Sequence, residues 1–176
     1  AASGNLPDAA ELAQSGQLAN FSFGQGSLLA SPVQIAAMMN AIASGGMYRT
    51  PFFLECTVDE TDGTPLETLA HPQSRRVMSA KNVALLRKML CQVVEEGTAQ
   101  DAAWLEEGAG GKTGTAQTGQ FTPDGTERKN LWFAGFYPAQ QPRYTIVVLQ
   151  DGQTGPSRTS AAIFARVCDA LDAAGE

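Results

Sequence analysis

Three strand-like runs follow one another in the second half of the chain, and they limit what it can fold into more than any other feature. They span residues 110–117, 131–137 and 144–150, and the last two are dense in β-branched and aromatic residues. The first connection, from Thr118 to Asn130, is long and polar with a Pro-Asp-Gly turn, and the second is short. Runs spaced in this way predict an antiparallel meander of about three strands.

Three amphipathic helices are predicted from the spacing of apolar residues. The first two follow residues suited to capping a helix N-terminus, Ser31 and Ser79, and the third begins at about Thr159. The first also has a proline at its first position and a capping-box partner, Gln34, and glycines end the first two helices. The predicted apolar faces are formed by Ile35, Met38, Met39 and Ile42, by Val83, Leu86, Leu90 and Val93, and by Phe164, Val167, Cys168 and Leu171.

A small β-hairpin is predicted between the first two helices. Its strands span Phe52 to Asp59 and Pro65 to Leu69, and they are joined across Asp62-Gly63. Helices set against one antiparallel sheet make an α+β fold. A hydrophobic content of 43% and a charged content of 17% suit a single core, so the 176 residues are expected to form one domain or a large part of one.

Charge and residue counts argue against several kinds of function. The net charge is −6 and Lys and Arg do not cluster, so nucleic acid is not expected as a partner. Cys56, Cys91 and Cys168 lack ligand spacing, so we expect neither a metal nor a cofactor, and these cysteines are interpreted as small buried hydrophobes. His71 is the only histidine and lies in a polar stretch, so lysine-based serine chemistry is more economical than a Ser-His-Asp triad.

Two other groups of residues could suggest a different activity. The pair Trp132-Phe133 could form a platform for a ligand, but such a pair more often belongs to the core. A paired-carboxylate hydrolase would need two acidic side chains fixed on one face, and nothing in the sequence fixes them. The candidate carboxylates, interpreted as solvated loop charges, are Glu106, Glu107, Asp124 and Glu127.

The segment 111–117, Gly-Lys-Thr-Gly-Thr-Ala-Gln, carries the most specific chemistry in the chain. Lys-Thr-Gly followed by a small or hydroxylated residue is one of three signatures of penicillin-binding proteins and serine β-lactamases. An exposed turn would explain the three letters alone, and a phosphate-binding loop would need a glycine where Glu106 stands. The chain contains no Ser-x-x-Lys tetrad, so the motif would supply one wall of an acyl-transfer site without its serine.

Further segments turn this motif into a specific resemblance. They are Gly4-Asn5-Leu6-Pro7, the stretch from Gly24 to Ala36 that contains Gly-Gln-Gly and Ser-Pro-Val-Gln, Gly45-Gly46 with Pro51, Gly97-Thr98-Ala99, and the stretch from Leu131 to Phe136. In this order they resemble the motifs of class B penicillin-binding proteins, the monofunctional peptidoglycan transpeptidases of septation and elongation. The likeness covers nearly the whole chain, although Ser31 replaces the commoner threonine.

The resemblance implies a partial β-lactamase/transpeptidase-like fold. In this family the Ser-x-x-Lys and Ser-x-Asn elements precede the Gly-x-Leu-Pro loop, so residues 1–176 are expected to be the C-terminal part of a transpeptidase domain. Ser3-Gly4-Asn5 spells Ser-x-Asn but falls inside that loop, and we interpret it as coincidence. The chain alone is therefore expected to be inactive, whereas the parent protein is expected to be a serine D,D-transpeptidase.

The resemblance also implies roles for the residues of the Lys-Thr-Gly strand. The backbone N–H of Thr115 would be an oxyanion donor, and the hydroxyls of Thr113 and Thr115 would face the substrate carboxylate. Lys112 would add positive charge for the carboxylate of the terminal D-alanine, and Gly114 would leave room for substrate against the strand. The nucleophilic serine and its lysine would come from the upstream part.

The partners implied by the resemblance are peptidoglycan stem peptides, β-lactams and, through the parent, the cell-wall synthesis machinery. The parent would be anchored in the bacterial cytoplasmic membrane with this domain on the outer side, and the fragment itself would be soluble. In the family, upstream strands cover the strand that matches Tyr144 to Leu149, so a bare edge here predicts a homo-oligomer through that segment. A non-catalytic β-lactam sensor or structural module of the same fold remains the alternative.

Overall fold

The central sheet confirms the predicted meander. The structure, a computed structural model, describes residues 3–68, 73–155 and 158–175. Strands β5 (Gly110–Phe121), β6 (Glu127–Tyr137) and β7 (Tyr144–Gln153) pair antiparallel in the order β5-β6-β7. Both β5 and β7 are therefore edge strands within the part of the chain that the structure describes.

The connection between β5 and β6 is shorter than the sequence predicts. Most of the polar stretch from Thr118 to Asn130 extends the two strands, and Phe121 pairs with Glu127 across a register shift. Its side chains are largely exposed, so this part of the hairpin needs no apolar alternation, which is the signal that strand prediction uses. The Thr118 hydroxyl donates a hydrogen bond to the Arg128 carbonyl across the two strands. The turn itself, at Pro123-Asp124-Gly125, is where the sequence places it.

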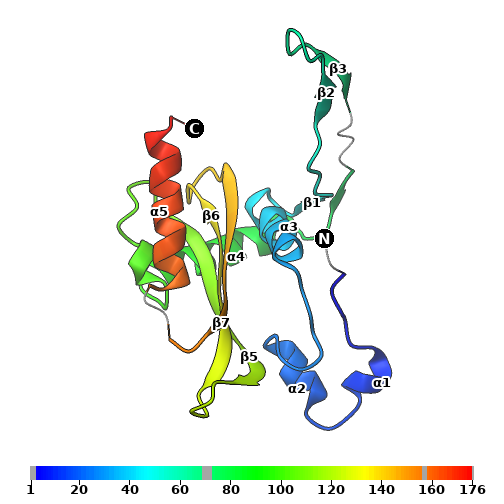
Figure 1. Cartoon of the computed structure of the whole chain (residues 1–176), viewed down its shortest axis with the longest axis vertical. Helices are drawn as coiled ribbons and strands as arrows, with labels where there is room; N and C mark the ends of the chain where they lie inside the picture. Colours follow the sequence, from blue (N-terminus) through cyan, green and yellow to red (C-terminus); the bar gives the residue numbers. More distant parts are fainter. Residues whose placement is uncertain (1–2, 69–72, 156–157, 176) are drawn as a thin grey trace.

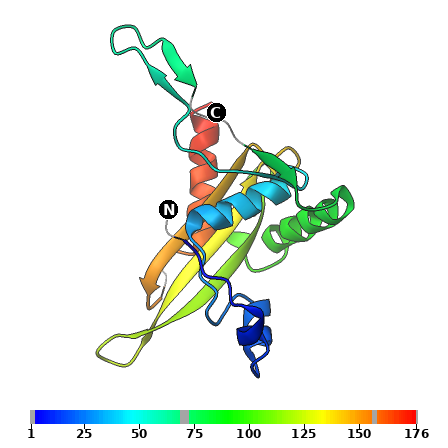
Figure 2. The same cartoon turned by 90° about the vertical axis from the view of Figure 1, so that its right-hand side faces the viewer.

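Helices cover both faces of the sheet, as Figures 1 and 2 show. Helix α5 (Ser160–Ala173) packs on one face, and α3 (Pro32–Ala43) and α4 (Ala80–Glu95) pack on the other. The predicted N-caps Ser31 and Ser79 are confirmed, because each hydroxyl accepts a backbone N–H of the first turn and Ser31 also completes a capping box with Gln34. Thr159 caps α5 in the same way. The predicted α+β architecture is therefore confirmed.

The core lies on the two sides of β6. Phe133 and Tyr137 point toward α5, whereas Ala134 and Phe136 point toward α3 and α4, and all four are buried. Successive residues of a strand face opposite sides of a sheet, so a strand covered on both faces reads as an uninterrupted apolar run. This requirement explains the sequence of β6 from residue 131 to residue 137.

Two predicted helix-face residues are exposed. Met38 is 49% exposed and borders an apolar hollow that also contains Tyr48 and Val77. Val167 is 40% exposed, because α5 presents Phe164 and Cys168 to the core and Val167 falls beside that stripe. Cys168 is buried as expected, whereas Cys56 and Cys91 are only partly buried.

A hairpin arm projects from the body of the molecule, in the upper part of Figure 1. Its strands β2 (Cys56–Val58) and β3 (Pro65–Thr68) pair as predicted, but residues 52–55 are not in the strand, and Leu69 and His71 lie outside the described residues. A second small sheet, β1 (Met47–Arg49) with β4 (Ser74–Arg76), joins the arm to α3 and α4. The sequence does not predict it, since β4 is polar and all three of its residues are exposed.

Two short helices, α1 (Ala9–Leu12) and α2 (Gln17–Ser22), precede α3 and lie near one end of the sheet in Figure 1. A single 3-10 turn, η1 (Gln100–Ala102), connects α4 to β5. Within the ranges that the structure describes, no helix has both the length and the apolar character needed to cross a membrane.

Candidate active site

The Lys-Thr-Gly motif lies on β5, and glycines before it bring that strand close to the core. A Cβ atom added at Gly110 would lie 2.2 Å from the Phe136 ring, and one at Gly111 would lie 2.3 Å from the Phe133 ring. These separations are too short for any side chain, so two aromatic rings of β6 cover the glycine backbone. The start of the motif is thereby fixed against a buried and rigid part of the sheet.

Gly114 is a glycine of a different kind. A Cβ atom there would meet the Cβ of Trp132 at 3.4 Å, which is ordinary contact, and the residue is exposed. The fold therefore tolerates a methyl group at this position and does not explain the glycine. Trp132, its partner across the strands, is only half-buried, whereas the neighbouring Phe133 is fully buried core.

Lys112 and Thr113 form a polar cluster with the Gly-Thr-Ala segment. The Lys112 ammonium donates to the Thr113 carbonyl at 3.0 Å and to the Thr113 hydroxyl at 3.2 Å. The Thr98 and Thr113 hydroxyls share a hydrogen bond of 2.8 Å. The turn after α4 thus places a second threonine on the motif, and the cluster offers a cation and two hydroxyls at an exposed strand edge.

Thr115 directs its carbonyl toward the open edge of β5. The side-chain amide of Gln25 donates a hydrogen bond to that carbonyl at 3.3 Å, across 90 positions of sequence. In an antiparallel ladder the N–H and C=O of one residue point to the same side of the strand. The N–H of Thr115 therefore also faces the open edge, away from β6.

The N-terminal loop is tied to the segment that carries Gln25. Asn5 and Leu29 form an antiparallel bridge, and the Asn5 side chain donates to the Ser27 carbonyl at 2.7 Å. A Cβ atom on Gly4 would lie 2.4 Å from the Leu29 carbonyl oxygen, so only glycine fits there. The Gly-x-Leu-Pro loop and the Gly-Gln-Gly stretch therefore form one unit beside β5.

The structure brings the predicted site residues Lys112, Thr113, Gly114 and Thr115 together on one strand edge, as any single strand must. It adds Gln25 and Thr98, which sequence reasoning did not assign to the site. Both belong to segments that resemble family motifs, so the sequence marked these segments as important. It did not show that they contact β5.

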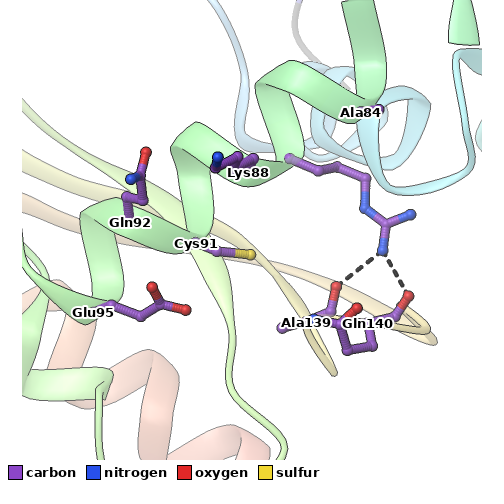
Figure 3. A pocket seen from close by; sticks show the side chains of 8 residues that line it. Ala84, Lys88, Cys91, Gln92, Glu95, Ala139 and Gln140 are labelled. Carbon is purple, nitrogen blue, oxygen red and sulfur yellow. Dashed lines mark hydrogen bonds between the residues drawn. The ribbon is translucent and has the colours of Figure 1, made fainter. Parts of the chain in front are cut away.

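Other polar groups of the molecule lie apart from this edge. A shallow hollow of about 460 Å³ lies between α4 and the β6–β7 turn, where Arg87 donates to the carbonyls of Ala139 and Gln140. Figure 3 shows the Cys91 sulfur pointing from α4 toward that turn. Burial raises the pKa of the Cys91 thiol, which keeps it in the unreactive protonated form.

The suspected carboxylates do not form a pair of catalytic acids. Glu106, Glu107 and Asp124 are exposed loop residues, as predicted. Glu127 instead lies on β6, half-buried, where it accepts a hydrogen bond from Gln117. Over residues 3–68, 73–155 and 158–175, no group of three or more His, Cys, Asp or Glu side chains is arranged to hold a metal ion.

Comparison with known proteins agrees with this arrangement. The family model described as the penicillin-binding protein transpeptidase domain matches residues 2–169. The chain belongs to this family. Among curated relatives of this chain, peptidoglycan D,D-transpeptidase PbpA of Mycolicibacterium smegmatis is 31% identical over 172 residues, which are 97% of this chain and 33% of that protein.

Solved structures of penicillin-binding proteins have the same fold. Penicillin-binding protein 3 of Mycobacterium tuberculosis in complex with aztreonam matches with a TM-score of 0.82 and 29% identity, over 99% of this chain and 41% of that one. Penicillin-binding protein A of M. tuberculosis, as an imipenem acyl-enzyme, matches with a TM-score of 0.77 and 25% identity, over 91% and 35%. The chain thus spans less than half of the solved chains and about a third of the curated relative.

Proposed function

We propose that this chain forms the Lys-Thr-Gly side of the active site of a serine D,D-transpeptidase that cross-links peptidoglycan stem peptides. The observation that carries the proposal is the meeting of Lys112, Thr113 and Thr98 in one polar cluster on the open edge of β5, with the Thr115 backbone directed to the same edge. Acyl transfer needs such an edge, because the tetrahedral intermediate carries an oxyanion that preorganised N–H donors stabilise.

The chemistry divides between this chain and the part of the protein that holds the serine. The serine oxygen attacks the carbonyl of the penultimate D-alanine, and its proton passes through the neighbouring lysine to the amine of the leaving D-alanine. The N–H of Thr115 donates to the carbonyl oxygen as negative charge develops on it. An acceptor amine then attacks the acyl-enzyme, forms the cross-link and releases the serine.

Lys112, Thr113 and Gly114 position the substrate in this scheme. The ammonium and the threonine hydroxyls are suited to the carboxylate of the terminal D-alanine, since hydrogen bonds between charged partners are the stronger ones. Gly114 leaves its face of β5 open beside Trp132, and no packing contact requires a glycine there. An extended peptide can therefore lie against the strand.

β-Lactams enter the same site as mimics of the scissile peptide and acylate the serine. Relatives of this fold have been solved with aztreonam and as an imipenem acyl-enzyme, which supports this part of the proposal. The parent protein would be held at the outer side of the bacterial cytoplasmic membrane, where its substrate and the cell-wall synthesis machinery are found. Self-association of this chain through the exposed edge of β7 belongs to the same proposal.

The test uses the protein expressed from its complete reading frame. Purified protein is incubated with a stem peptide that ends in D-Ala-D-Ala, and separately with benzylpenicillin, and D-alanine release and covalent adducts are measured. A transpeptidase releases D-alanine and forms a penicilloyl adduct. Adduct formation without D-alanine release would instead identify a β-lactam sensor, and the absence of both would reject acyl-transfer chemistry.

A further inference from the structure

The side-chain amide of Gln25 donates a hydrogen bond to the Thr115 carbonyl of β5, the backbone acceptor that a peptide substrate would use. Its amide nitrogen lies 3.3 Å from the Thr115 carbonyl oxygen, near the long end of the range for N–H···O hydrogen bonds. The residue is half-buried, in the loop between α2 and α3. A contact of this length, made by a side chain at the open edge of a strand, is weak enough for a better-aligned donor to replace it.

The loop is built to present this side chain. Gly24 and Gly26 flank Gln25 with φ angles of +81° and +83°, a conformation that side-chain-bearing residues rarely adopt. The Gln25 N–H donates to the Asn20 carbonyl at 2.9 Å, which anchors the loop to α2. Two left-handed glycines and one anchoring bond therefore fix the point from which the Gln25 amide reaches β5.

The antiparallel geometry of β5 determines what competes with Gln25. Both the N–H and the C=O of Thr115 face the open edge, so an extended peptide laid antiparallel there exchanges two hydrogen bonds with this one residue. If the Thr115 N–H holds the carbonyl oxygen under attack, the Thr115 carbonyl accepts the amide N–H of the same substrate residue. That N–H is the group whose place the Gln25 amide takes in the free protein.

We propose that Gln25 is a specificity-determining residue whose amide stands in for the substrate N–H at the Thr115 carbonyl and must be displaced by ligands that carry an amide at that position. The inference rests on the proposed function, because it takes the Thr115 N–H as the oxyanion donor. Ligands without such an amide leave the Gln25 contact in place. Removal of the Gln25 amide then favours amide-bearing ligands selectively.

The experiment measures the acylation rate constants of the protein expressed from its complete reading frame with two β-lactams. Benzylpenicillin carries an acylamino group beside the β-lactam carbonyl, and penicillanic acid has the same bicyclic ring without it. Gln25→Met keeps the size of the side chain and removes the donor, and Gln25→Ala removes both. Gln14→Ala, an exposed glutamine of the same helical region, is the matched control.

We expect both Gln25 variants to raise the rate constant for benzylpenicillin about two- to ten-fold, the range that one net hydrogen bond represents. The rate constant for penicillanic acid should stay unchanged, and Gln14→Ala should affect neither ligand. Equal losses with both ligands would show that Gln25 only supports the fold, and unchanged rates with both would show that it does nothing here. Either result overturns the inference. If neither β-lactam acylates the wild-type protein, the proposed function is overturned as well.

Discussion

The contacts of Lys112 suggest that its ammonium binds substrate and does not support the fold. The residue is exposed, and both hydrogen bonds given for its ammonium go to Thr113. Its side chain therefore contributes little to the packing of the sheet. A cation held at a strand edge by weak contacts is free to bind a carboxylate. The residue is therefore suited to binding substrate, and we expect little effect of its removal on folding.

We predict that Lys112→Ala in the protein from its complete reading frame lowers the acylation rate constant for benzylpenicillin by about 10²-fold or more, the scale of losing one electrostatic contact to the transition state. The midpoint of urea unfolding should not change. Lys112→Arg, which keeps the charge, should recover part of the rate. A full rate in Lys112→Ala would show that the ammonium is not part of the site.

Gly111 and Gly114 form a matched pair that separates packing from function. A methyl group on Gly111 would collide with the buried Phe133 ring, so we predict that Gly111→Ala lowers the free energy of unfolding by about 1–3 kcal/mol. Gly114→Ala should change that free energy by less than about 0.5 kcal/mol and instead slow acylation, because its methyl group occupies space needed by substrate. Urea unfolding and acylation of the two variants would measure this, and the reverse pattern would contradict the assignment.

At the residue level the sequence identifies candidate site residues better than it predicts the contacts between them. Lys112 to Thr115 could be named as candidates because a signature motif fixes their spacing. The hydrogen bonds from Gln25 and Thr98 could not be found, since they join positions 90 and 15 residues apart and depend on how loops approach β5. Motif order along a chain carries no distances between motifs.

At the level of elements, prediction succeeded where burial imposes a pattern. Strand β6 and helix α5 carry apolar residues because the core requires them, so their positions follow from the sequence. The extension of β5 and β6 beyond Gln117 and strand β4 are largely polar and exposed, so no buried apolar pattern marks them in the sequence. Backbone hydrogen bonds are available to every residue type, so these parts leave no sequence signal.

The contact between β6 and α5 predicts how stability depends on pH. Burial raises the pKa of the Cys168 thiol from 9.0 to about 12, and burial together with a hydrogen bond to Asp172 raises the pKa of Tyr137 above its ordinary value of 10.0. Both groups keep their protons in the folded state and lose them more easily when unfolded. Stability is therefore complete below about pH 9 and falls as the pH rises toward 12.

The measurement is the urea midpoint of the chain at about pH 8 and about pH 10.5. We expect a lower midpoint at the higher pH, and a smaller difference between the two in Cys168→Ala and in Tyr137→Phe. Tyr48→Phe, which lies outside this core, serves as the control. A midpoint that rises or stays constant over this interval would contradict the prediction.

At the scale of the whole molecule, the exposed edge of β7 is the main liability. The strand pairs only with β6 among the described strands and is half-buried and mostly apolar from Tyr144 to Leu149. We predict that the chain associates with itself in a concentration-dependent way, because an unpaired apolar edge recruits another strand. Leu149→Lys should shift the light-scattering mass toward that of the monomer, whereas Leu85→Lys on the exposed face of α4 should not. A constant monomer mass at all concentrations would contradict this.

The central claim is that this chain provides one wall of an acyl-transfer site and that the nucleophilic serine lies elsewhere in the protein. The most direct test is the intact mass after incubation with benzylpenicillin, measured for this chain and for the protein from its complete reading frame. We predict a penicilloyl adduct on the longer protein and none on the chain of residues 1–176. An adduct on the isolated chain of residues 1–176 would contradict the claim, because the nucleophile would then lie within it.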